Sequence, residues 1–499
     1  MRKLGKLCLV FLALVALLSV LAVACGGGGD KEATPTAKAT VAATAKATVA
    51  ATAKATVAAT AKATVAASAT ATVVATAKPT TSPTTSTTPT AVPTTPPTVE
   101  ATIEPTPPPS AYDPTNPDIG ITDTEIILGT HFSLTGIYGN AFGPVLKGMK
   151  AYFAYVNTEL GGIAACGNRK VVLKVENDDY EAAKSPAAVR KLVEQEHVFA
   201  IVAGLGTAAH SAVWEYLNEK GIPDLWIMSG AHKWAADPVA HPWSYAILPD
   251  YYVEGTIFGK YISENLAGKK VGVIYQNDDY GKDELAGVKN GLDSTKNELV
   301  SEQPYDSLAI DIRAQVNKLK SDGAEVVVGG GIPGHMAQLI KGAYQMDWHP
   351  QFFIGYVNSS TAMFVYAQPY VEAMDGVLTL QGNKMDWWTD DPARAEHHRL
   401  MATYSDENPS SNSVMGQITG ETMVDVLAEA CNRGDLTRQG VIDVVNSIKD
   451  EQRDLRLDGI TTSFSATDHS AVEAMKFLRA HVVDGVGTYE YEGDFVSFR

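Results

Sequence analysis

The chain has 499 residues, a formal net charge of −17 and four cysteines. The acidic balance disfavours nucleic acid and anionic membrane surfaces as partners. The cysteines form no CxxC pair and no Cys/His spacing typical of a metal site, so we expect no metal and no cofactor. Residues 118–499 are long enough for two ordinary domains.

Residues 1–24 have the organisation of a secretory signal peptide. A basic start precedes an apolar run over residues 7–23. Cys25 comes after a small residue at the end of this run and resembles the lipobox cysteine of bacterial lipoproteins, although Ala22 stands where Leu is commonest. The resemblance implies that Cys25 is acylated and anchors the chain at the outer face of the cytoplasmic membrane. Two alternatives stay open: an ordinary signal peptide, or a retained span, for which the apolar run is short.

Residues 25–117 are of low complexity. An ATAKATVA repeat places a lysine every eight residues, and a Thr/Pro-rich tail follows it. Such a composition cannot bury enough apolar surface to offset the entropy of the chain. We therefore predict a disordered linker that tethers the folded part to its anchor.

From residue 124 onward, apolar strands alternate with amphipathic helices. Continuous apolar strands separated by such helices indicate parallel sheets covered on both faces, an α/β fold with two doubly wound lobes. In the helix at 185–196, Ser185 is expected to be the N-cap and Pro186 the first helical residue. Strands are expected at 125–132, 170–178, 198–204, 223–230, 269–275, 324–330 and 350–357, and helices at 145–156, 185–196, 208–221, 281–292, 311–323 and 335–346.

The motif NDDY occurs twice, at 177–180 and 277–280, each time directly after a predicted strand. This repetition is a mild indication of two similar lobes. A metal site at the acidic pairs is a weaker interpretation, because adjacent carboxylates at a strand end are more often solvated.

Ligands of open α/β sheets bind at the carboxyl ends of the strands. The residues of interest therefore lie in the loops 131–143, 204–210, 229–234, 276–281, 330–335 and 356–360. In the second of these loops, Gly206 and Thr207 open a helix, where Thr207 is expected to cap the helix or to donate to a carboxylate. Four aromatic residues are candidates for the wall of an apolar pocket, with ordinary packing as the alternative for each: Tyr138, Phe142, Trp234 and Tyr280.

Four stretches occur in a recognisable order: GTHFSLTGIYG, GLGTAAHSAVWEYLNEKGIP, SGAHKW and GVIYQNDDYGKDELAGVKNGL. Together they resemble the leucine/isoleucine/valine-binding protein family, the periplasmic type I solute-binding proteins of ABC importers. The resemblance implies two Rossmann-like lobes joined by three crossovers, with ligand trapped between them by hinge closure. The first lobe would comprise 118–248 plus 384–474, and the second 249–383 plus 475–499. The resemblance also implies that the protein is a monomer and that a membrane permease is its partner.

The family's ligand contacts can be carried over at several positions. Thr207 matches the hydroxyl that binds the ligand carboxylate, and Ala231 matches a position that gives backbone contacts. Lys233 falls where a hydroxyl residue commonly contacts the same carboxylate. Phe142 matches an aromatic wall and Tyr280 the tyrosine of a YG motif.

One departure from the family concerns the ligand's amine. Family members that bind amino acids have a glutamate for the ammonium group, and here Val357 or Asn358 occupies that position. With Lys233 expected near the carboxylate, the sequence suggests an anionic ligand without a free amine. Cys166 and Cys431 would be the cysteines of the folded part, and whether they pair is left open.

The sequence disfavours an enzyme. It lacks the GK[ST] of a P-loop, the third glycine of a dinucleotide fingerprint, GxSxG and HExxH. His397 and His398 are expected on the solvated face of a helix. The sequence thus predicts an extracytoplasmic solute-binding lipoprotein that delivers a small carboxylate-bearing or amino-acid-like ligand to an ABC permease. The alternatives are a ligand-binding sensor module acting on a membrane receptor and a structural surface protein.

Overall fold

The computed structural model describes residues 119–385, 388 and 390–498. The predicted signal peptide, Cys25 and the linker lie outside the described residues. None of the helices in the described part combines the length and apolar character needed to cross a membrane.

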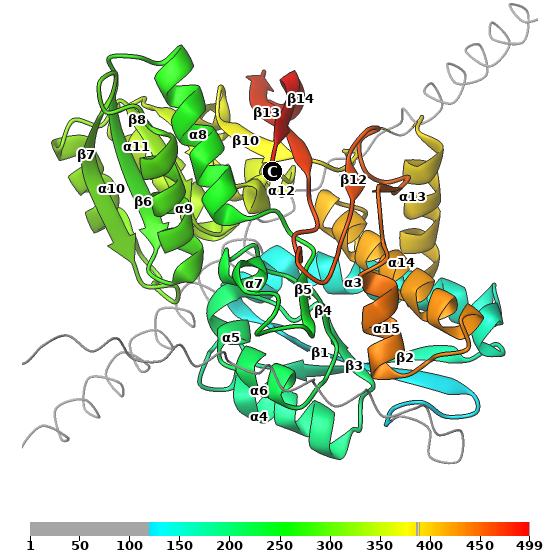
Figure 1. The fold of residues 1–499 in the computed structure, drawn as a ribbon. Coiled ribbons are helices and arrows are strands. Elements are labelled where there is room, and N and C mark those ends of the chain that lie inside the picture. The colour runs from blue at the N-terminus through cyan, green and yellow to red at the C-terminus, as the bar shows by residue number, and fades with distance from the viewer. Residues whose placement is uncertain (1–118, 386–387, 389, 499) are drawn as a thin grey trace, which may run out of the picture. The chain divides into compact units, whose positions relative to one another are not determined.

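The first lobe is built on a five-stranded parallel sheet with the order β2-β1-β3-β4-β5 (Figure 1). Its strands are β1 (Glu125–Phe132), β2 (Lys170–Asn177), β3 (Ala200–Val202), β4 (Asp224–Ile227) and β5 (Ser244–Ala246). The helices between them are α3 (Gly136–Thr158), α4 (Ser185–Arg190), α5 (Thr207–Ser211), α6 (Trp214–Glu219) and α7 (Lys233–Ala236), with a π turn at Lys191–Gln195. The α/β alternation read from the sequence is confirmed.

Two local predictions in this lobe are wrong. Ser185 is not the N-cap of its helix, because its hydroxyl donates to the buried carboxylate of Asp178 (2.9 Å) and Lys184 occupies the cap position. The helix expected over 208–221 is divided into α5 and α6. Before this break, His210 contacts the buried ring of His131, and after it Trp214 packs against Trp234.

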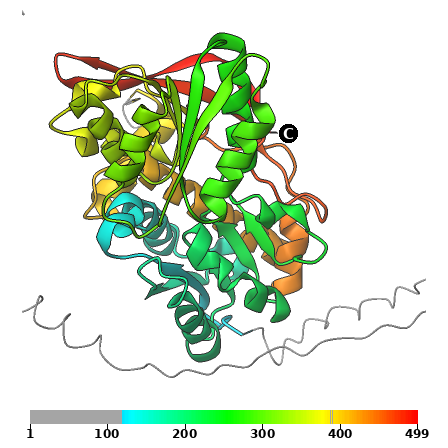
Figure 2. The same ribbon diagram turned by 90° about the vertical axis from the view of Figure 1, so that its left-hand side faces the viewer.

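The second lobe contains a seven-stranded sheet with the order β14-β13-β10-β9-β8-β6-β7. Its strands are β6 (Lys270–Gln276), β7 (Glu298–Tyr305), β8 (Val326–Gly330), β9 (Gln351–Ile354), β10 (Leu378–Gln381), β13 (Ala474–Val483) and β14 (Val486–Ser497). Strands β6 to β10 are parallel, whereas β13 and β14 add an antiparallel hairpin at one edge, drawn in red in Figure 2. The helices are α8 (Tyr251–Asn265), α9 (Asp279–Gly291), α10 (Arg313–Ser321), α11 (Pro333–Gln345) and α12 (Ala362–Ala367).

Helices α8 and α9 lie side by side (Figure 1). Glycines permit this close approach. A Cβ at Gly287 would lie 2.1 Å from the carbonyl oxygen of Tyr252, and one at Gly255 would lie 2.3 Å from that of Glu284. A larger residue at either position would therefore push the helices apart, and with them the strand ends that they support.

The chain passes between the two sheets three times. It leaves β5 for α8, returns after β10 to α13 (Pro392–Tyr404), and crosses again between β12 (Thr461–Thr462) and β13. After the second passage, α14 (Ser411–Asn432) packs along α3, with α15 (Arg438–Val445) and β11 (Glu451–Gln452) following. The lobe boundaries at 248, 383 and 474 stay predictions.

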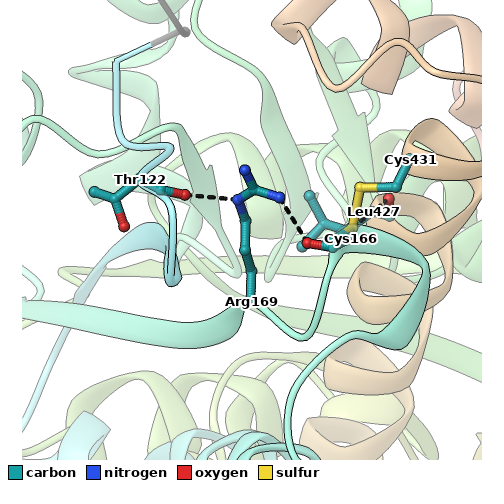
Figure 3. Close-up of a disulfide and its surroundings, with 5 residues drawn as sticks. All are labelled: Thr122, Cys166, Arg169, Leu427 and Cys431. Atoms are coloured by element: carbon teal, nitrogen blue, oxygen red, sulfur yellow. Dashed lines mark hydrogen bonds between the residues drawn. A yellow bond between two sulfur atoms is a disulfide. The ribbon is translucent and has the colours of Figure 1, made fainter.

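A disulfide joins Cys166 to Cys431, with Cα atoms 5.2 Å apart (Figure 3). It connects the short 3-10 turn after α3 to the end of α14. Beside it, the Arg169 guanidinium donates to the carbonyl oxygens of Thr122 and Cys166, both at 2.6 Å. The bond closes a separation of 265 residues, so it restricts the unfolded chain strongly.

Candidate functional site

A cavity lies where the strand ends of the two sheets face each other. Its empty space is about 700 Å³, with open solvent at its mouth included. It is lined by Phe142, Val145, Tyr180, Leu205, Gly206, Thr207, Met228, Leu248, Tyr251, Tyr280, Ile332, Tyr356, Val357, Ser359, Gln381, Asn383, Ser411, Asn412 and Met415. Both lobes and the start of α14 contribute. None of these described lining residues carries a formal charge.

Four buried tyrosines form much of the wall. The rings of Tyr251 and Tyr280 lie 4.1 Å apart, and Tyr180 stacks on Tyr138 at 3.5 Å. Burial raises the pKa of the Tyr180, Tyr251, Tyr280 and Tyr356 hydroxyls above the usual value. All four are therefore neutral, and they give the cavity a broad apolar surface with a few hydroxyl groups.

The polar lining residues are held by neutral hydrogen bonds. The Thr207 and Ser229 hydroxyls lie 2.6 Å apart, and the Gln381 amide donates to Ser359 Oγ at 2.8 Å. Two buried polar atoms of the lining have no hydrogen-bond partner among the described residues, the Tyr356 hydroxyl and Asn383 Oδ1. Buried polar groups are normally paired, so these two are candidates for contact with a ligand.

The lobes contact each other around the cavity. The Tyr138 hydroxyl of α3 donates to the Ser307 carbonyl oxygen (2.7 Å) and lies 3.1 Å from Gln276 Oε1. Lys233 forms an ion pair with Asp279 at 2.8 Å. Each of these contacts joins a first-lobe residue to the second lobe, so the structure represents a closed arrangement of the site.

The structure brings four of the sequence-predicted residues to the cavity wall: Phe142, Gly206, Thr207 and Tyr280. Tyr138 is buried behind Tyr180 and joins the lobes. Trp234 is also buried and donates to Ser229 Oγ at 3.0 Å. Ala231 lines a separate small cavity with Trp234. Asn358 donates to the carbonyl oxygens of Gly331 and Gly355, behind the wall.

Two expectations need correction. Lys233 was expected near a ligand carboxylate, but its ammonium group is taken by Asp279 and Ser211 outside the cavity lining. The ion pair between the lobes satisfies its charge. His397 was expected on a solvated face, yet it is fully buried between Gln417 and Ser413, while His398 is only half-buried. Contact with α14 provides both hydrogen-bond partners of His397.

Sequence reasoning missed much of the wall. Tyr180 had a signal, because it occupies the same place in the first NDDY as Tyr280 in the second. Tyr356 lies in the strand-end loop 356–360 but was not singled out within it. Tyr251 and the residues of α14 had no signal, since no motif or period marks them. Ser411, Asn412 and Met415 reach the cavity because α14 packs along α3.

Beneath the loop 204–207, a buried chain of four side chains crosses the first lobe. Asp178 Oδ2 lies 2.7 Å from His131 Nδ1, His131 Nε2 lies 2.9 Å from His210 Nδ1, and His210 Nε2 lies 2.8 Å from Asp224 Oδ2. Each of the three contacts needs one proton to form a hydrogen bond. Two neutral imidazoles supply only two protons, so this network of side chains holds a third proton. A Cβ at Gly204 would lie 2.6 Å from the His210 ring, so this chain directly supports the loop.

The second lobe holds a different buried cluster. Glu254 accepts the backbone N–H of Tyr356 at 2.6 Å, and its carboxyl shares a hydrogen bond with the carboxyl of Glu284. Outside this pair, the other Glu254 oxygen and both Glu284 oxygens have no partner in the described part. Burial raises the pKa of Glu254 to about 8. Burial and the neighbouring Glu254 charge raise the pKa of Glu284 well above its usual value. Both carboxyls are therefore expected to be mainly protonated at neutral pH.

Comparison with known proteins gives a consistent result. A family model described as "Periplasmic binding protein" matches residues 125–485. An amino acid binding protein of Pseudomonas aeruginosa is 28% identical over 228 residues, which cover 44% of this chain and 58% of that protein. A Leu/Ile/Val-binding protein homolog of Brucella melitensis is 29% identical over 280 residues, which cover 52% of this chain and 73% of that protein.

Solved structures share the fold. A branched-chain amino acid ABC transporter protein from Thermus thermophilus with bound valine has a TM-score of 0.66 at 16% identity, covering 75% of this chain and 98% of that one. A fatty acid ABC transporter substrate-binding protein from Thermomonospora curvata has a TM-score of 0.64 at 21% identity, covering 75% and 93%. Proteins of this fold thus bind ligands of different chemistry.

Proposed function

Because the chain belongs to the periplasmic binding protein family, we propose that it is an extracytoplasmic solute-binding lipoprotein. It captures a small carboxylate-bearing or amino-acid-like ligand between its lobes and delivers this ligand to an ABC import permease. The observation that carries the proposal is the cavity to which both lobes and α14 contribute. A ligand in this space contacts both lobes at once and stabilises their closure.

The chemistry of the wall supports a small organic solute. Apolar and aromatic side chains cover most of it, and a few hydroxyl and amide groups can orient one polar end of a ligand, as is typical of small-molecule sites. The relatives' names add that two proteins of this family bind amino acids. They are binding proteins rather than enzymes, which fits a non-catalytic role.

The proposal is tested by a thermal-shift screen of the purified protein. The panel contains leucine, isoleucine and valine, the amine-free acids isovalerate and benzoate, and the amides isovaleramide and benzamide. A ligand present at a hundred times its dissociation constant adds about 2.7 kcal/mol to the stability of the folded state. We expect at least one carboxylate of the panel to raise the melting temperature by several degrees. A panel in which no compound shifts the melting temperature would contradict the proposal.

The lipid anchor is tested separately. Cells that express the chain are fed a labelled fatty acid, and we expect the label to be incorporated and the protein to fractionate with membranes. A Cys25→Ala variant should lose the label. Label that persists in this variant, or its absence from the unchanged chain, would contradict acylation at Cys25.

A further inference from the structure

Arg456 is a buried arginine that has no counter-ion among the residues that the structure describes. It lies in the segment between β11 and β12, and only 2% of its surface is exposed. Among the described residues no carboxylate lies within ion-pair distance of it, and Nε has no hydrogen-bond partner. A buried charge normally occurs only with a partner, because its removal from water costs several kcal/mol, on the order given for buried ions.

The neighbouring arginine, Arg453, is buried as well but is paired with acidic residues. Arg453, three residues earlier, is also buried, and its guanidinium forms ion pairs with Asp425 and Glu451. Asp425 and Glu451 are thus engaged by Arg453, which also repels Arg456. Burial, together with this repulsion, lowers the pKa of Arg456 to about 10, so its guanidinium stays charged at neutral pH.

Arg456 lies directly behind the cavity wall. Its backbone forms an isolated antiparallel bridge with Asn383, and its charge interacts with Tyr356. Both neighbours line the cavity, and both have a buried polar atom without a partner in the described part. A buried, unpaired guanidinium thus lies next to two lining residues that each have an unpaired polar atom.

We infer that Arg456, Tyr356 and Asn383 form an anion-recognition corner, and that the ligand is a carboxylate with an apolar body and no ammonium group. The inference rests on the proposed function and names the class of its ligand. A carboxylate at this corner would accept hydrogen bonds from the Tyr356 hydroxyl and from Asn383 Nδ2, with the Asn383 amide turned so that Nδ2 and not the unpaired Oδ1 faces the ligand. It would also neutralise the Arg456 charge across them.

An ammonium group fits this cavity poorly. The described lining contains no carboxylate that could pair with it, and Arg456 would repel it. Glu254 and Glu284 lie behind the same wall, but burial raises the pKa of both, which keeps them protonated and removes the charge that an amine needs. The apolar body would instead pack on the tyrosines and on Met228, Ile332 and Met415.

The test compares acids with their amides by calorimetric titration. The probes are isovalerate and isovaleramide, benzoate and benzamide, and leucine. The variants are Arg456→Gln, Arg456→Lys and a control that removes one exposed positive charge, Arg433→Gln. We expect Arg456→Gln to weaken the binding of an acid by about 10–100-fold, as for the loss of a charged contact, and to leave its amide unaffected. Arg456→Lys should retain part of the preference, and the control all of it.

The melting temperature of the unliganded protein separates recognition from a structural role. Removal of an unpaired buried charge should leave it unchanged or raise it. If Arg456→Gln lowers the melting temperature and weakens acid and amide equally, the arginine is structural and the inference fails. If the unchanged protein prefers leucine to the amine-free acids, the ligand class is wrong while the proposed function stands. If no probe binds, the proposed function fails and this inference with it.

Discussion

The two lobes differ in how well their buried polar side chains are hydrogen-bonded. In the first lobe, Asp178, His131, His210 and Asp224 are fully buried, and each of their three mutual contacts is a hydrogen bond of 2.7–2.9 Å. In the second lobe, Glu254 and Glu284 are equally buried, but outside their mutual hydrogen bond three of their four oxygens have no partner in the described part.

The two clusters therefore differ in their effect: the first supports the geometry of a loop, and the second can change its charge state. A satisfied network specifies one geometry and holds the loop 204–207 in place. An unsatisfied cluster costs stability, and its charge state depends on pH and on what enters the neighbouring cavity.

The largest effect is expected in the satisfied network. His131→Leu leaves the Asp178 carboxylate buried without its imidazole partner, which should lower the free energy of unfolding by about 3–5 kcal/mol. Chemical denaturation measures this value. The control is Lys191→Ala, which breaks a half-exposed pair with Glu176 and should cost less than about 1 kcal/mol. An equal loss of unfolding free energy in the two variants would mean that the buried network stabilises the fold no more than an exposed ion pair does.

The unsatisfied pair should make stability depend on pH. Folding raises the pKa of Glu254 from 4.5 to about 8, so its contribution is fully present below pH 4.5 and is lost as the pH rises to about 8. Glu284→Gln removes one of the two acids. We expect the free energy of unfolding of this variant to be about 1–3 kcal/mol higher than that of the unchanged protein at pH 8, and the two values to be equal near pH 4.5.

Denaturation curves across this pH range measure the effect. Glu302→Gln, at an exposed acid paired with Lys289, serves as the control and should leave the pH dependence as it is. A Glu284→Gln variant that loses more stability at pH 8 than near pH 4.5 would show that the ionised carboxylate is needed, against this account.

A smaller effect is expected at the contact between the lobes. Tyr138→Phe keeps the stacking on Tyr180 but removes the hydroxyl that donates to Ser307. The closed arrangement should lose about 1 kcal/mol, which weakens ligand binding about 5-fold without changing the order of preference among ligands. Calorimetric titration measures both, with the exposed Tyr344→Phe as control. A changed order of preference would instead place Tyr138 in ligand recognition.

The smallest effect concerns the ion pair of Lys233 and Asp279. Both side chains are partly exposed, by 29% and 47%, so the pair should contribute less than about 1 kcal/mol to closure and weaken further in salt. A double-mutant cycle with Lys233→Met and Asp279→Asn, read out as ligand affinity, gives the interaction energy. A large coupling that persists at high salt would argue that Lys233 contacts the ligand after all.

The sequence predicts the architecture better than the site. Alternating apolar strands and amphipathic helices were sufficient for the fold class, and two of the residues selected by the rule of strand ends, Thr207 and Tyr280, line the cavity. Their role in binding stays a prediction. Arg456 could not be found in this way, because it lies in an irregular segment between β11 and β12 and not at the carboxyl end of a strand of either large sheet. Lys233 was misplaced because its partner, Asp279, is on the other lobe.

The central claim is that a small organic acid binds in the cavity between the lobes. Calorimetric titration of isovalerate and benzoate into two variants tests it most directly. Val357→Trp fills the cavity from a partly exposed lining position, and Val365→Trp adds the same side chain at an exposed position of α12. The account predicts that Val357→Trp abolishes the binding seen with the unchanged protein, while Val365→Trp retains it. Binding that survives in Val357→Trp would place the ligand elsewhere and contradict the account.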